Sequence, residues 1–306
     1  MESTIWSPPG VSTRRGFLLT AGVTLAVLAL AQPAAAWWGD THGLLTRAAV
    51  QALPQEVPAF FREGAETAAH ISFDPDVAKN RRVPHVRHGE HPEHFADIEL
   101  LQGEELPDQR YDFIALCHTL GIAPDEAGFA PYAITEYVER LAVAFAEHRK
   151  WPQNGVIQVK CLVYAGFLGH YAEDIVQPLH ATIHYNGRVG EDGSRTGAGI
   201  HEKVDSLIER IGLTAAELGE GVEPAPLEGE LFAAVRDQVL ESNGQVDRVY
   251  ELAGGLDPVS EPARAFAEER GRLAVAFTAS LYLTAWRLSE DIRLPSWLKR
   301  SPEAVE

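Results

Sequence analysis

The chain has 306 residues, of which 45% are hydrophobic and 23% are charged, and its formal net charge is −18. This length is enough to bury a large core, and the composition is that of a soluble globular protein. So acidic a surface repels phosphate backbones and argues against stable binding of duplex nucleic acid. It does not exclude hydrolysis of phosphate esters, because bound metal ions can invert the local electric field.

The first 36 residues are predicted to be a twin-arginine export signal. Arg14 and Arg15 precede an apolar run over residues 17–30, and residues 34–36 are alanines suited to cleavage. The apolar run is shorter than an ordinary membrane span. An uncleaved N-terminal anchor is the alternative.

Cleavage after Ala36 would make Trp37 the first residue of the mature protein, with Trp38 as the alternative. We expect residues 37–306 to form one domain without a transmembrane span. Twin-arginine export would place it outside the cytoplasm, in the periplasm or the extracellular space.

Apolar residues recur at helical spacing along most of the mature chain. Asp40 or Thr41 is a possible cap for a first helix that includes Leu44, Leu45 and Ala48. Longer helices are predicted at residues 111–120, 131–148, 155–177, 231–253 and 262–289.

Other segments are predicted to form turns and loops. Residues 63–94 predict short helical turns and ordered loop, with a turn at 74–76, and the Gly-rich residues 186–199 predict a loop. No long alternating strand pattern occurs, so the fold class is predicted to be all-α, a single compact multi-helix domain.

The two cysteines, Cys117 and Cys161, lie in apolar, helix-like surroundings. Buried free thiols are one interpretation and a single disulfide is the other. Their spacing is not that of a thiolate zinc site.

The stretch from Gly169 to His180 reads G-H-Y-A-E-D-I-V-Q-P-L-H. His170 and Asp174 are four residues apart, so on a helix both side chains lie on one face. Pro178 cannot continue the helix and should turn the chain, which would bring His180 beside the pair.

A second pair with the same spacing follows at His201 and Asp205. Together the two pairs and His180 would form a cluster of imidazoles and carboxylates. Such nitrogen and oxygen ligands, without cysteine, suit zinc at a catalytic site.

These motifs resemble those of the bacterial zinc-dependent phospholipases C and the single-strand-specific nucleases of fungi and plants. The likeness runs from Trp37 to about Asp205 and rests on the H-x-x-x-D-x-x-x-x-x-H motif, on Q-P-L-H, on the second pair and on H-F-x-D at residues 94–97. It implies an all-α phosphodiesterase with three zinc ions, in which metal-activated water attacks phosphorus.

By resemblance, nine residues would hold the three ions. The first ion would take Asp76, His94, His170 and Asp174; the second His180, His201 and Asp205; the third Trp37, through its free amine, with His42 and Asp174. Asp74 is the alternative to Asp76, which would also serve as the catalytic base.

The resemblance further implies that substrate contacts come from Lys79, Phe95 and Asp97. The expected substrate is a phosphodiester, either a phospholipid headgroup or a single-stranded nucleic acid or nucleotide. The interval from Trp37 to His42 favours the nucleases, but the G-G-N and W-D elements that nucleases show are missing.

Two other functions remain open at this point. One is a non-catalytic extracytoplasmic protein whose helices are held together by zinc. The other is a zinc store that uses the histidines between His85 and His94.

Overall fold

The helical periodicity of the sequence is carried through in the computed structural model, which describes residues 39–227 and 229–300. Helix makes up 66% of the structure and strand 2%. The predicted all-α fold is therefore confirmed. The proposed leader, Trp37 and Trp38 lie outside the described residues.

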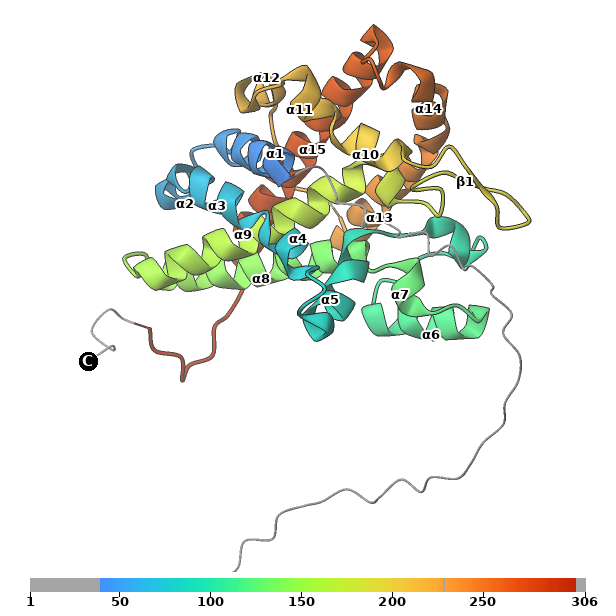
Figure 1. Cartoon of the computed structure of the whole chain (residues 1–306). Helices are drawn as coiled ribbons and strands as arrows, with labels where there is room; N and C mark the ends of the chain where they lie inside the picture. The colour runs from blue at the N-terminus through green and yellow to red at the C-terminus, as the bar shows by residue number, and fades with distance from the viewer. Residues whose placement is uncertain (1–38, 228, 301–306) are drawn as a thin grey trace, which may run out of the picture. The chain divides into compact units, whose positions relative to one another are not determined.

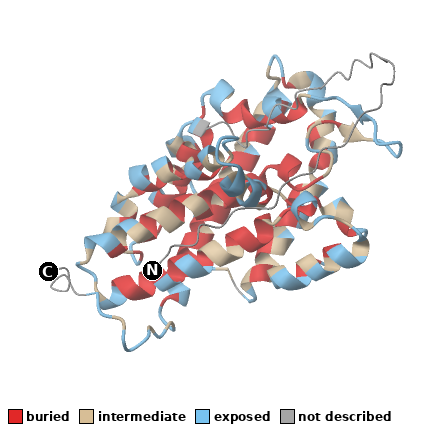
Figure 2. Ribbon diagram, turned by 60° about the horizontal axis from the view of Figure 1, so that its bottom comes forward, coloured by how far each residue is buried: buried red, intermediate tan, exposed pale blue. Residues whose placement is uncertain are grey.

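Three long helices pack against one another at the centre (Figure 1): α8 (Ala130–Lys150), α9 (Gly155–Val176) and α15 (Glu261–Leu288). Each matches a predicted helix to within two residues at either end. Their buried faces are largely apolar, and Figure 2 shows the buried residues gathered in the interior of the helical domain. Removing such faces from water is the main force that holds the helices together.

Helix α1 (Gly39–Gln51) packs on α9 and α15, and α3 (Ala65–Ile71) and the short α2 (Ala59–Glu63) pack on α1 and α9. The predicted first helix is thus confirmed, but its predicted cap is wrong. Asp40 and Thr41 lie inside the first turn of α1 and do not precede it.

The segment between α3 and α8 begins with short elements, as predicted for residues 63–94, and also contains the helix predicted at 111–120. Its elements are α4 (Asp74–Ala78), α5 (Pro84–Glu90), η1 (His91–His94), η2 (Ile98–Leu101), α6 (Arg110–Leu120) and α7 (Pro124–Ala127). Residues 74–76, predicted as a separate turn, form the start of α4, because proline is well suited to the first turn of a helix.

The chain after α9 departs from prediction in two places. The predicted loop at 186–199 contains a two-stranded antiparallel hairpin, β1 (Arg188–Val189) with β2 (Arg195–Thr196). The predicted helix at 231–253 is divided into α13 (Leu231–Gly244) and α14 (Val246–Glu251). The division follows Gly244, and glycine is a poor helix former.

The remaining elements of this part are short. They are η3 (Pro178–His180), α10 (Ile200–Asp205), α11 (Leu207–Ile211), α12 (Ala215–Gly219) and η4 (Ala253–Gly255).

Arg270 on α15 is fully buried and holds the C-terminal end of α9. Its Nε and Nη2 donate to the carbonyl oxygen of Val176 at 3.0 and 2.7 Å, and its guanidinium pairs with Glu241 at 2.7 Å. A buried cation with these partners is satisfied, whereas removal of one partner would leave it costly. The end of α9 is therefore fixed in place.

Two other sequence-based expectations are tested by the fold. Cys117 and Cys161 are both buried and free, so they do not pair. Among the described residues, none of the helices combines the length and apolar character needed to cross a membrane.

Candidate metal centre

The C-terminal end of α9 presents His170 and Asp174 one turn apart, as their spacing predicts. Gln177 leaves the helix with an extended backbone (φ −76°, ψ 116°), because Pro178 follows it. The short η3 then returns His180 towards Asp174, whose Oδ1 lies 3.8 Å from His180 Nδ1.

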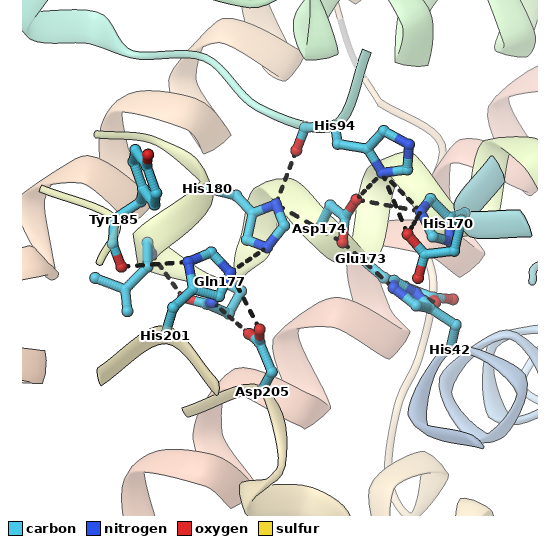
Figure 3. A network of polar contacts seen from close by, with 12 residues as sticks. His42, His94, His170, Glu173, Asp174, Gln177, His180, Tyr185, His201 and Asp205 are labelled. Carbon is cyan, nitrogen blue, oxygen red and sulfur yellow. Dashed lines mark hydrogen bonds and ion pairs between the residues drawn. The ribbon is translucent and has the colours of Figure 1, made fainter. Parts of the chain in front are cut away.

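Asp174 is the hub of the site (Figure 3). Its Oδ1 lies 3.3 Å from His42 Nε2 on α1, and its Oδ2 lies 2.9 Å from His94 Nδ1 on η1. The same Oδ2 lies 3.3 Å from His170 Nε2. With His180, one buried carboxylate is therefore within 4 Å of four imidazoles from four elements.

The ligand atoms form three compact groups, in each of which they lie within 4.8 Å of one another. The groups are His42, His170 and Asp174; Asp76, His94 and His170; and His180, His201 and Asp205. Eight of the nine residues that the resemblance implied thus come together. His170 belongs to two of the groups, although it was assigned to one ion only.

Backbone carbonyls orient three of these imidazoles. The Nδ1–H groups of His170, His180 and His201 donate to the carbonyl oxygens of Ser72, His94 and Tyr185, at 2.8, 2.8 and 3.2 Å. This assigns the proton to Nδ1 and turns each Nε2 towards the cluster.

The group on η3 and α10 shows the consequence most clearly. The Nε2 atoms of His180 and His201 face each other at 3.1 Å, and Asp205 Oδ2 lies 3.1 Å from His201 Nε2. Two lone pairs pointing at one another repel unless a cation or a proton lies between them. Neutral imidazole nitrogen is also the form that binds metal.

Glu173 supports His42 from behind. Its Oε2 accepts a hydrogen bond from His42 Nδ1–H at 2.8 Å, and its Oε1 accepts one from the Thr46 hydroxyl at 2.7 Å. A carboxylate on the far nitrogen of a ligating histidine fixes its tautomer and raises its basicity. Sequence reasoning missed this role, because Glu173 and His42 are 131 residues apart.

Gln177 has the matching role for the other group. Its Nε2 donates to Asp205 Oδ1 at 2.7 Å, while its Oε1 accepts from the backbone N–H of Leu179 at 2.6 Å. The second oxygen of Asp205 is left facing His201. Sequence reasoning also missed this role of Gln177, although its place before Pro178 marks the point where the helix ends.

The chain matches no model of a known protein family, and no curated protein matches it. The chemistry of the site is therefore inferred from its own residues. Four buried side-chain atoms of the cluster have no hydrogen-bond partner: His42 Nε2, His94 Nε2, Asp174 Oδ1 and Asp205 Oδ2.

Buried polar atoms without partners are rare, because each costs about 1–3 kcal/mol. Three of these four atoms face other possible ligands of the groups. His94 Nε2 instead faces Glu90, with His94 Nδ1 turned to the cluster. The donor set of imidazoles and carboxylates fits divalent metal ions, zinc among them. The described residues thus contain buried clusters able to hold metal.

The charges of the site are strongly coupled. Burial lowers the pKa of His42, but Asp174 and Glu173 outweigh it and raise that pKa to about 10. Burial likewise opposes ionisation of Asp174, yet the imidazoles of His180 and His170 hold the Asp174 pKa well below its usual range. The carboxylate is therefore ionised, as a metal ligand must be.

Asp76 and Lys79 lie at the rim of the site. Asp76 Oδ1 is 3.8 Å from His170 Nε2 and 2.5 Å from Lys79 Nζ. Asp74, the alternative ligand, is exposed and belongs to none of the groups. Asp76 is therefore the one of the two that the fold brings to the cluster.

Phe95 and Asp97 follow His94 on the side of His180. Phe95 is half-buried, and Asp97 is 8% exposed. Burial, with the nearby charge of Glu99, raises the pKa of Asp97 to about 8. A backbone hydrogen bond from Ala96 N–H to the His180 carbonyl at 2.9 Å ties this segment to the second group.

The remaining predicted histidines lie elsewhere. His85, His88 and His91 are exposed and belong to none of the groups found in the described chain, whereas His94 is buried and does. In the described chain, the histidines of this run therefore do not form one common ligand group. Trp37 lies outside the described residues.

Proposed function

We propose that the protein is a zinc-dependent hydrolase of phosphoric esters. The observation that carries this proposal is the hub at Asp174, a single buried carboxylate surrounded by four imidazoles, with a second ligand group reached through His180. Clusters of ligand groups that share residues are suited to hold metal ions a few ångströms apart, the arrangement used in phosphoryl transfer. The motif resemblance described above agrees with this reading.

Zinc bound at these groups would lower the pKa of water and neutralise charge on the ester oxygens. The chain's own residues would hold and orient it: Asp174 between groups, Glu173 behind His42, and Gln177 behind Asp205. Asp76 at the rim is placed to accept a proton from water, and Lys79 beside it to face an anionic ester.

The third ion depends on processing. Helix α1 begins at Gly39, only two residues after Trp37, and carries His42 in its first turn. We propose that export and cleavage after Ala36 free the Trp37 amine to join His42 and Asp174. N-terminal sequencing of the secreted protein tests this, since a mature chain that begins elsewhere contradicts it.

The proposal is tested by metal analysis and by hydrolysis of a chromogenic phosphodiester. We expect about three zinc ions per mature chain, loss of hydrolysis on chelation and recovery with zinc. The exposed histidine variant His85→Ala is a matched control that should keep both. A protein that contains zinc but hydrolyses no phosphate ester under any of these conditions would refute the proposal.

One observation favours a second candidate, a non-catalytic protein held together by zinc. His42, His170 and Asp174 are all 0% exposed, as ligands of a structural ion are. This candidate predicts that chelation unfolds the protein and that zinc restores folding without hydrolysis. A melting curve with and without chelator, run beside the hydrolysis assay, separates the two.

A further inference from the structure

Residues 77–88 form an exposed surface, here called the basic–apolar surface, whose charge is opposite to that of the whole chain. It contains Lys79, Arg81, Arg82 and Arg87 and no acidic residue, in a protein of net charge −18. The Lys79 side chain is only 11% exposed and pairs with Asp76, so the exposed charge comes mainly from the arginines. Both Arg81 and Arg82 are exposed.

The same segment exposes aliphatic side chains. Val77, Val83 and Val86 are 66%, 44% and 52% exposed, and they are three of the eleven large hydrophobic residues that are exposed in the described chain. A single exposed valine needs no explanation, but three within ten residues do.

Local contacts fix the fold of this segment. The short helices α4 and α5 contact each other, and Arg87 Nη1 donates to the Lys79 carbonyl at 2.9 Å across the turn between them. The backbone N–H of Val83 donates to the Asn80 carbonyl at 3.1 Å. The cations and the valines therefore belong to one folded unit, which Figure 1 shows as α4 beside α9 and α5 next to α4.

This unit borders the metal centre at both of its ends. Lys79 pairs with Asp76 of the cluster, and Glu90, the last residue of α5, has its Oε1 3.8 Å from His94 Nε2. A partner held on the basic–apolar surface would thus lie next to the ligand groups.

We propose that the basic–apolar surface docks the protein on a membrane interface that contains anionic phospholipid. Basic side chains are attracted to anionic headgroups, and neighbouring aliphatic side chains enter the headgroup boundary. The acidic remainder of the chain is repelled by the same interface, so the protein binds with this side towards the lipid. A nucleic-acid strand is the weaker fit, because residues 77–88 include no Phe, Tyr or Trp on which bases stack.

This proposal concerns binding and stands apart from the hydrolase proposal. The test is flotation of the mature protein with vesicles of equal parts phosphatidylglycerol and phosphatidylcholine, against vesicles of phosphatidylcholine alone. We expect binding to the anionic vesicles only, weakened by salt.

Two pairs of variants locate the surface. Arg81→Gln with Arg82→Gln should lower the vesicle partition coefficient roughly 30-fold, since each basic residue contributes ~1 kcal/mol near such a membrane. The control, Arg140→Gln with Lys150→Gln on α8, makes the same charge change on another exposed face and should have little effect.

Val83→Ser with Val86→Ser should cause a smaller, severalfold loss, whereas Val156→Ser with Val159→Ser, at exposed positions of α9, should not. Circular dichroism and zinc content confirm that every variant is folded. Absence of a preference for anionic vesicles, or equal losses in variant and control, overturns the proposal. Binding of a single-stranded oligonucleotide that needs the arginines but not the valines, without vesicle binding, overturns it in favour of a nucleic-acid surface.

Discussion

The ligand group around Asp174 and the group of His180, His201 and Asp205 differ in the elements that carry them and in the residues that support them. The first is carried largely by the long α9 and by α1, and its supporting residue is the carboxylate of Glu173. The second is carried by the three-residue η3 and the six-residue α10, and its supports are backbone carbonyls and the neutral amide of Gln177.

The difference concerns rigidity and charge. Long packed helices fix ligands before any metal binds, whereas short elements beside a hairpin can adjust to an ion or a substrate. The first group also has two buried carboxylates, the ligand Asp174 and the supporting Glu173, while the second has only Asp205. We therefore expect tighter metal binding in the Asp174 group and more adaptable chemistry in the His201 group.

The largest effect is expected for Asp174→Asn. This change removes the charge that faces four imidazoles, so zinc content should fall in both groups that Asp174 touches. Hydrolysis should drop on the order of a thousandfold. Zinc analysis and single-turnover rates measure the two losses, and retention of all zinc would show that the hub is not a ligand.

A smaller, local effect is expected for His201→Ala. It removes a ligand from the second group and leaves the Asp174 group intact, so about one ion should be lost and the rest kept. Hydrolysis should fall roughly a hundredfold. If His201→Ala instead emptied the whole site, the two groups would not be separable.

The supporting residues sharpen the comparison. Glu173→Gln keeps the size of the side chain but removes its charge, so it should weaken zinc binding at His42 by about 10–100-fold. The matched change at the other group, Gln177→Leu, should weaken binding at Asp205 less, because it removes a neutral partner. Chelator competition measures both, and rescue by Glu173→Asp would separate the loss of charge from a packing defect.

The smallest effect concerns pH and Asp97. Its pKa is about 8 in the folded protein and 3.8 in its ordinary state, so between these values the folded protein binds the proton and the unfolded chain does not. Stability from this group is thus greatest at low pH and is lost as pH rises to about 8.

From pH 6 to pH 7 the free energy of unfolding should fall by about 1 kcal/mol through Asp97. Urea unfolding of wild type and Asp97→Asn at both pH values measures the difference, because the variant lacks this slope. An unchanged slope in the variant would show that Asp97 is ionised in the folded state.

The parts of the fold that could be predicted are those set by local sequence. The spacing of His170 and Asp174 and the break at Pro178 specify α9 and the return of His180, and the structure shows both. The division at Gln245 and the hairpin at 188–196 were missed, since a glycine at a helix end and two-residue strands leave little periodicity.

The site was predictable for the same reason and only to the same extent. Ligand pairs within one helix can be read from spacing, but the support of His42 by Glu173 depends on how α1 packs on α9. The sharing of His170 between two groups also depends on where Ser72 and Asp76 lie, and no local pattern encodes that.

Two hydrogen bonds described above link the ligand groups directly. His180 Nδ1–H donates to the carbonyl of His94, and Ala96 N–H donates to the carbonyl of His180, at 2.8 and 2.9 Å. A movement of His94 should therefore also move His180, and the reverse. Zinc in the Asp174 group should therefore help to order His180, so zinc should bind the His201 group more tightly when the Asp174 group is filled than when it is empty.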